Sequence, residues 1–211
     1  MSTEQDLRQE IVDTVDELFA LDMITSTGGN VSARIPDEED AFLITPTRLH
    51  KGGLTPELMV KINGKGKPYN RRQRPSVETR VHLAIYAAYP DIEAAIHSHA
   101  KMCTVLGLIN GSVPPICVEA VTFADTQIVP YGLPGTPELC ENVVKALEHS
   151  PAVLLQNHGL LTVGWTVRHA ANRAIALERI VRMMLACRLF GKEPVTIPPD
   201  TVELVRSLGA I

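Results

Sequence analysis

AVLLQNHGLLTV (152–163) contains two short apolar runs separated by a polar turn. Runs of this length, rich in Val and Leu and bounded by Asn and Gly, predict two buried strands, at 152–156 and 160–163, joined by a tight turn. His158 lies inside that turn. Because burying an imidazole without a partner costs free energy, we expect another group to bind this side chain.

A second apolar strand, predicted over residues 92–98, ends in the segment AIHSHA (95–100). Side chains alternate along a strand, so His97 and His99 lie on one face while Ser98 points away. Two imidazoles on one face can share a metal ion, and a catalytic zinc site usually has three protein ligands and one open position. His158 is the best candidate for the third ligand. The H-x-H pattern alone also occurs among structural and surface histidines, so both interpretations stay open here.

The rest of the chain alternates between helical and strand patterns, with tight turns at some junctions and helices at others. This order predicts an α/β fold with one mixed, largely antiparallel sheet and helices packed against its faces. We expect a single domain over residues 1–211. Helices are predicted at 4–21, 75–88, 100–108, 137–149, 167–190 and from Asp200 onward; the remaining strands are predicted at 31–35, 41–45, 61–63 and 127–129.

The predicted helix at 75–88 begins with PSVE. Ser76 is a candidate N-cap, Val77 belongs to the apolar stripe, and Glu78 lies in the first turn, where the helix dipole favours a carboxylate. His82 follows Glu78 by four residues and can pair with it across one turn. Glu78 is therefore either a helix-start residue or a general acid/base or fourth metal ligand.

Composition excludes several classes of function. The chain has 211 residues, 45% hydrophobic content and a net charge of −4, which fits one domain with its own core and gives no basic excess for nucleic acids or anionic membranes. The N-terminal segment has no apolar run typical of a signal peptide, so we expect a cytoplasmic protein with neither nucleic-acid nor membrane partners. The four cysteines are far apart, and we expect reduced, buried thiols.

Six motifs occur in order and together resemble the class II aldolase/adducin family: GGNVSAR (28–34), ITPTRL (44–49), PSVE (75–78), HSHA (97–100), VPYGLPGT (129–136) and LLQNHGLL (154–161). The resemblance implies a three-layer α/β/α domain that forms a cyclic homotetramer with metal sites near subunit interfaces. It implies that His97, His99 and His158 bind Zn²⁺, or another divalent ion such as Mn²⁺ or Co²⁺. It assigns acid/base chemistry, with a contact to the metal, to Glu78, and phosphate binding to Gly29, Asn30, Thr47 and Ser76.

The resemblance also implies a reaction on a small phosphorylated sugar or sugar acid. In the aldolase reaction, a ketose 1-phosphate such as L-fuculose 1-phosphate is cleaved to dihydroxyacetone phosphate and an aldehyde through an enediolate that the metal stabilises as a Lewis acid. Decarboxylases, dehydratases and pentose-phosphate 4-epimerases of the same fold are alternatives. A non-catalytic, adducin-like interaction module is a further one, although such a module would not need the three histidines and Glu78.

Three positions depart from the pattern of the family. Arg48 replaces a glycine after TPT, and it either binds a phosphate or carboxylate or points to solvent. Val77 replaces a serine. The position of a proton-donating tyrosine falls near Cys117 and Val118, where no tyrosine occurs but Glu119 is close. These departures concern the substrate and leave the metal ligands in place.

Overall fold

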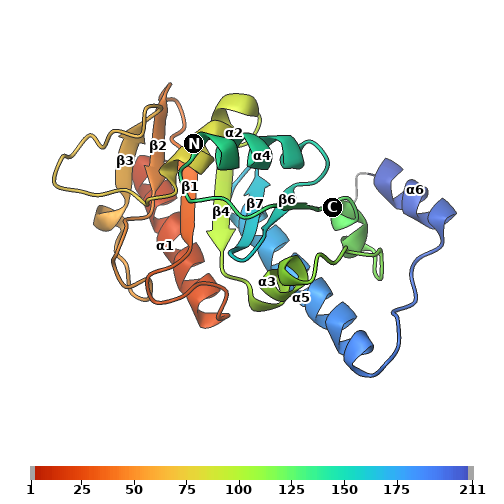
Figure 1. Ribbon diagram of the computed structural model, residues 1–211. Coiled ribbons are helices and arrows are strands. Elements are labelled where there is room, and N and C mark those ends of the chain that lie inside the picture. Colours follow the sequence, from red (N-terminus) through yellow and green to blue (C-terminus); the bar gives the residue numbers. More distant parts are fainter. Residues whose placement is uncertain (1–2, 209–211) are drawn as a thin grey trace.

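Seven strands form one sheet in the computed structural model, which describes residues 3–208 (Figure 1). Their order across the sheet is β3-β2-β1-β4-β7-β6-β5. Every neighbouring pair is antiparallel except β5 and β6, which are parallel, so the predicted mixed and largely antiparallel sheet is confirmed. The strands are β1 Asn30–Arg34, β2 Ala41–Ile44, β3 Val60–Asn63, β4 Ala94–Ser98, β5 Gln127–Val129, β6 Ala152–Leu155 and β7 Gly159–Gly164.

Helices cover both faces of this sheet and bury two separate apolar clusters against it. One cluster contains α1 (Glu4–Ala20), α3 (Lys101–Leu108) and α5 (Val167–Leu189). The other contains α2 (Thr79–Ala88) and α4 (Pro137–Leu147), which pack side by side in the upper part of Figure 1. The three-layer arrangement therefore follows from apolar side chains that point alternately to the two sheet faces.

Three further elements lie outside these layers. They are the 3₁₀ helices η1 (Pro56–Leu58) and η2 (Glu119–Phe123) and the helix α6 (Pro199–Ser207). The two 3₁₀ helices were not predicted from the sequence pattern. Helix α6 packs on η2 at the right of Figure 1, away from the sheet.

The start of α2 differs from the prediction. The helix begins at Thr79, Glu78 occupies the N-cap position without a side-chain capping bond, and Val77 is 68% exposed, so the predicted start at 75, the Ser76 cap and the apolar role of Val77 were wrong. The cause is a competing pairing: Pro75 forms a bridge with Pro46, and the Ser76 amide donates to the Thr45 carbonyl. These contacts hold 75–76 extended beside the end of β2.

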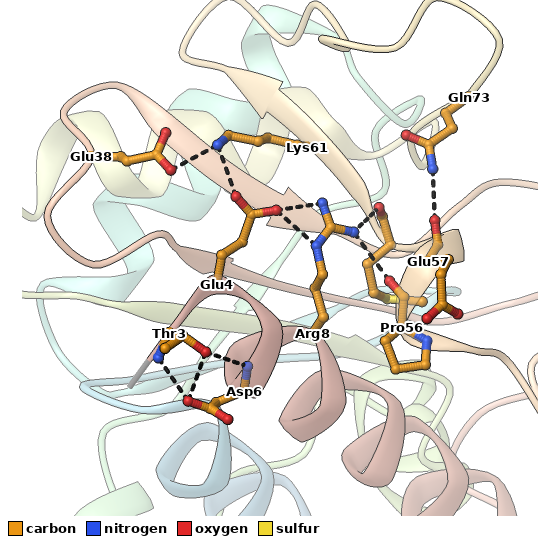
Figure 2. A network of polar contacts seen from close by, with 10 residues as sticks. Thr3, Glu4, Asp6, Arg8, Glu38, Pro56, Glu57, Lys61 and Gln73 are labelled. Carbon is orange, nitrogen blue, oxygen red and sulfur yellow. Dashed lines mark hydrogen bonds and ion pairs between the residues drawn. The ribbon is translucent and has the colours of Figure 1, made fainter. Parts of the chain in front are cut away.

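The edge strand β3 is attached to the start of α1 by a polar network (Figure 2). Lys61 contacts Glu4 at 2.8 Å and Glu38 at 2.7 Å, and Arg8 contacts Glu4 and the carbonyl of Pro56. A capping box between Thr3 and Asp6 begins the helix. Charged side chains along an exposed edge also discourage pairing with another sheet.

Other expectations concern the chain as a whole. All four cysteines are free thiols; Cys103 is buried, whereas the other three are only partly so. Within residues 3–208, no helix has the length and apolar character needed to cross a bilayer. The single domain, the cytoplasmic location and the absence of nucleic-acid partners stay predictions.

Candidate metal centre

The three histidines singled out in the sequence meet at one end of the central strands. His97 is on β4, His99 follows that strand, and His158 lies in the turn between β6 and β7. The ring centroid of His97 is 5.0 Å from that of His99 and 4.5 Å from that of His158. One ring nitrogen of each histidine lies within 4.8 Å of the corresponding nitrogens of the other two. Pairing of β4 with β7 brings them together, because His97 opposes Leu161.

The environment of His97 fits a metal ligand. Its Nδ1 lies 3.1 Å from the carbonyl oxygen of Leu160 and donates to it, whereas its buried Nε2 has no hydrogen-bond partner. A backbone carbonyl on one ring nitrogen is the usual means of orienting the other nitrogen toward a metal. Burial, followed by the neighbouring histidines, lowers the pKa of His97 well below its ordinary value, and burial lowers the pKa of His99 as well. Both rings are therefore neutral, which is the form that binds a cation.

Glu78 completes this group from the start of α2. Its Oε2 is 3.6 Å from Nε2 of His97, and its Oε1 is 3.6 Å from Nε2 of His158. Its carboxylate is mostly buried, with a side-chain exposure of 11%. At this position the carboxylate can contact either an ion held by the histidines or a substrate beside that ion.

A chain of hydrogen bonds behind Glu78 fixes the orientation of its carboxylate. Asn30 Nδ2 donates to Glu78 Oε2 at 2.5 Å, and Asn30 Oδ1 lies 2.5 Å from His82 Nε2. His82 Nδ1 is 2.6 Å from Ser32 Oγ, which is 2.6 Å from the Tyr86 hydroxyl. Because a carboxylate only accepts, every proton in this chain points toward Glu78. His82 therefore bonds to Asn30, and its predicted pairing with Glu78 was wrong.

The residues predicted to bind phosphate lie beside the histidines. A cavity of about 190 Å³ is lined by Glu78, His99 and His158 together with Gly29, Asn30, Thr47 and Ser76. Arg48 does not line this cavity: it is exposed, has a φ of 61°, and lines a neighbouring cavity of about 340 Å³. A positive φ favours glycine, which is the residue the family pattern has there.

One residue of this cavity was missed by the sequence reasoning. Lys51 lines the cavity and is only 1% exposed. The segment LHKGG around it gave no periodic or motif signal, because its burial comes from contacts that the loop makes in the fold. Glu119, considered as a substitute for the missing tyrosine, lines with Cys117 a different cavity of about 450 Å³ against α5.

Close backbone approaches keep the histidines in position. A Cβ on Gly28 would lie 2.5 Å from Cε1 of His99, so only glycine leaves room for that ring. After His99 the chain enters α3, and the buried carboxylate of Glu178 on α5 accepts from the amides of Met102 and Cys103 at 3.0 Å. An anion at these first amides offsets the helix dipole and anchors the histidine segment to α5.

A mixed sheet that gathers three imidazoles and a carboxylate at one end of its central strands defines an α/β protein with a candidate metal centre. The chain belongs to the class II aldolase and adducin family, since the model of the Class II Aldolase and Adducin N-terminal domain matches residues 9–185. This family is metal-dependent.

The individual relatives that match this chain include aldolases and a decarboxylase, which are lyases. The L-fuculose phosphate aldolase of Escherichia coli K12 is 36% identical over 196 residues, which cover 92% of this chain and 89% of that protein. A 3-oxo-tetronate 4-phosphate decarboxylase of Escherichia coli O6:H1 is 28% identical and covers 91% of each chain. The solved structure of an L-fuculose 1-phosphate aldolase matches with a TM-score of 0.88 and 30% identity, and covers 98% of this chain and 97% of that one. The chain is therefore a member of an enzyme family with this fold.

Proposed function

We propose that the protein is a zinc-dependent aldolase that cleaves a ketose 1-phosphate into dihydroxyacetone phosphate and an aldehyde. The observation that carries this proposal is one cavity lined by Glu78, His99, His158 and the phosphate-binding candidates, with His97 completing the histidine cluster beside it. Higher identity to an aldolase than to a decarboxylase, 36% against 28%, supports the choice between these reactions.

His97, His99 and His158 would hold the ion, and the orphaned Nε2 of His97 supports that assignment. Three imidazoles with an open position are a donor set that suits zinc, although Mn²⁺ or Co²⁺ can occupy similar sites. When bound, the ion supplies Lewis acidity that stabilises negative charge on the oxygens of the substrate.

Glu78 moves a proton in this proposal. Cleavage breaks the C3–C4 bond of the ketose, the C4 hydroxyl loses its proton as the aldehyde forms, and C3 gains a proton, so the reaction needs no oxidant or reductant. The hydrogen bond from Asn30 at 2.5 Å orients the carboxylate for this role. A positioned acid/base group contributes about 10² to 10⁴ in rate.

The experiment that tests the reaction measures products. Metal-loaded protein is incubated separately with L-fuculose 1-phosphate, 5-methylthioribulose 1-phosphate, ribulose 5-phosphate and 3-oxo-tetronate 4-phosphate. We expect dihydroxyacetone phosphate from a ketose 1-phosphate. Carbon dioxide from the last substrate would assign a decarboxylase, an isomeric pentose an epimerase, and a dehydrated product a dehydratase; inactivity throughout would favour an interaction module.

Two variants test the residues within the same assay. Glu78→Gln should lower turnover at least about a hundredfold with folding and metal content nearly unchanged, because it removes the ionisable proton. Glu141→Gln, on the exposed face of α4, is the matched control. The double variant His97→Ala, His99→Ala should lose the single zinc ion per chain that elemental analysis is expected to find. If the turnover of Glu78→Gln stays within a few-fold of that of the parent, Glu78 does not transfer the proton.

A further inference from the structure

Lys51 is one of the largest fully buried side chains among residues 3–208. Its amide donates to the carbonyl of Ser26 at 2.8 Å, which joins the loop after β2 to the segment STGGN (26–30) at the start of β1. Its Nζ donates to the carbonyl of Pro46 at 2.8 Å. Lys51 and Pro46 both line the cavity that also holds Gly29, Thr47 and Ser76, so the ammonium group bonds to a residue of the cavity wall.

The charge of Lys51 is not balanced by the fold. No carboxylate of the described residues lies within ion-pair distance of its Nζ. An ammonium group has three N–H donors, and a carbonyl oxygen accepts one of them. Burial lowers the pKa of Lys51 to about 8, an effect that the negative charge of Glu78 opposes, so the side chain is still mainly an ammonium at neutral pH.

A buried, unpaired ammonium is costly unless an anion reaches it. The neighbouring cations do not share this property. The adjacent cavity is lined by three arginines, Arg48, Arg72 and Arg74. All three side chains are exposed to solvent. Among residues 3–208, Lys51 is therefore the one lysine or arginine that lines the cavity beside the histidines, and its side chain is desolvated.

We propose that Lys51 is the cationic member of the anion subsite and binds the terminal phosphate of the substrate, beside the donors offered by Gly29, Thr47 and Ser76. This inference rests on the proposed function in taking the anion to be part of the molecule cleaved at the histidine site. It assigns the charge of the subsite to a lysine, whereas Arg48, which replaces the family's glycine, lies outside the cavity. A phosphate dianion suits the subsite because it offers several acceptor oxygens to a point charge and surrounding donors.

Binding of inorganic phosphate tests this proposal independently of turnover. Calorimetric titration of the metal-loaded chain compares the parent with Lys51→Met and with Lys65→Met, an exposed lysine after β3. Loss of one charge-assisted contact should weaken phosphate binding at least about tenfold in Lys51→Met. Lys65→Met should stay within about twofold, as expected for an exposed charge. The titrations are repeated after a chelator has removed the metal. The affinity measured then contains no contribution from phosphate that binds the metal ion.

The fold of the variant is checked by thermal unfolding without phosphate. Lys51→Met should melt at the same temperature as the parent or higher, because it removes an unpaired buried charge. Added phosphate should raise the melting temperature of the parent more than that of the variant. If Lys51→Met does not fold, Lys51→Gln takes its place in both measurements.

Three outcomes decide the matter. Equal phosphate affinity in the parent and in Lys51→Met would overturn the proposal. Lys51-dependent binding of acetate as tight as that of phosphate would replace the phosphate subsite by a carboxylate subsite. Lys51-dependent phosphate binding in a protein that releases no dihydroxyacetone phosphate would support the role of Lys51 and reject the aldolase reaction, so the two proposals fail separately.

Discussion

Asn30 shows how one residue can serve two sides of a site. It was singled out from GGN as a phosphate ligand, and it does line the cavity, but its side chain also links Glu78 to His82. His82 was interpreted as an ordinary helix residue because it follows Glu78 by one turn. In the fold it is fully buried, and burial lowers its pKa to about 4. Its neutral ring accepts from Ser32 and donates to Asn30.

The buried state of His82 predicts a pH dependence of stability. Its folded-state pKa of about 4 lies below the value of about 6.5 expected in the unfolded chain, so the unfolded state binds more protons between these values. The contribution of the neutral His82 side chain to the free energy of unfolding is fully present above about pH 6.5 and is lost as the pH falls toward 4. Burial also lowers the pKa values of His97 and His99, so the contribution of His82 must be measured by difference.

Urea unfolding at pH 7 and pH 4 measures that difference. We expect His82→Gln to reduce the pH-dependent loss of unfolding free energy by about 3 kcal/mol. His149→Gln, at an exposed position after α4, is the control for the substitution itself. Identical pH profiles for the parent and His82→Gln would show that His82 is not held neutral by the fold.

At the scale of elements, the junction of β4 and β7 determines the site. Gly159 begins β7, and a Cβ added there would lie 2.3 Å from the carbonyl oxygen of Ser98 and 3.2 Å from Cε1 of His97. The two strands can approach closely only because this residue has no side chain. The glycine in NHG is thus required by β4, a strand that lies more than fifty residues earlier in the chain.

Gly159→Ala should therefore separate β4 from β7 beside His97. We expect it to lower the free energy of unfolding by roughly 1 to 3 kcal/mol, as overpacking of an interior does. Zinc affinity, measured by competition with a chromogenic chelator, should fall at least about tenfold, comparable to the loss of a group that orients a ligand. Gly107→Ala is the control, since its Cβ would meet only atoms at 3.9 Å. Unchanged zinc affinity in Gly159→Ala would show that the strands adjust without moving His97.

For the whole molecule, the resemblance to the family implies a cyclic homotetramer. Large apolar side chains at the end of α5 and just after it are almost fully accessible in one chain: Leu189 is 88%, Phe190 84% and Val195 90% exposed. Such a concentration of exposed apolar side chains is typical of an interaction surface. A second subunit would also be a source for groups that the single chain does not bring to the cavity.

Sedimentation velocity tests the assembly. Four chains of 23.0 kDa give a mass of about 92 kDa (4 × 23.0), which we expect at micromolar concentration. Phe190→Ser should weaken the assembly, whereas Tyr69→Ser, which changes an aromatic residue 61% exposed on a distant loop, should not. A 23.0 kDa species alone would contradict the tetramer. An unchanged tetramer in Phe190→Ser would remove the end of α5 from its interface.

The sequence by itself determined the α/β class, nearly all helices and strands, and the three histidines that meet in the structure. These features depend on local periodicity: alternation placed His97 and His99 on one face, and the turn in AVLLQNHGLLTV located His158. Tertiary structure decided the start of α2, the partner of His82, the exclusion of Arg48 from the cavity and the burial of Lys51. Each of these depends on contacts between distant segments, such as Pro46 with Pro75, Asn30 with His82 and Ser26 with Lys51, and local patterns carry no record of such pairings.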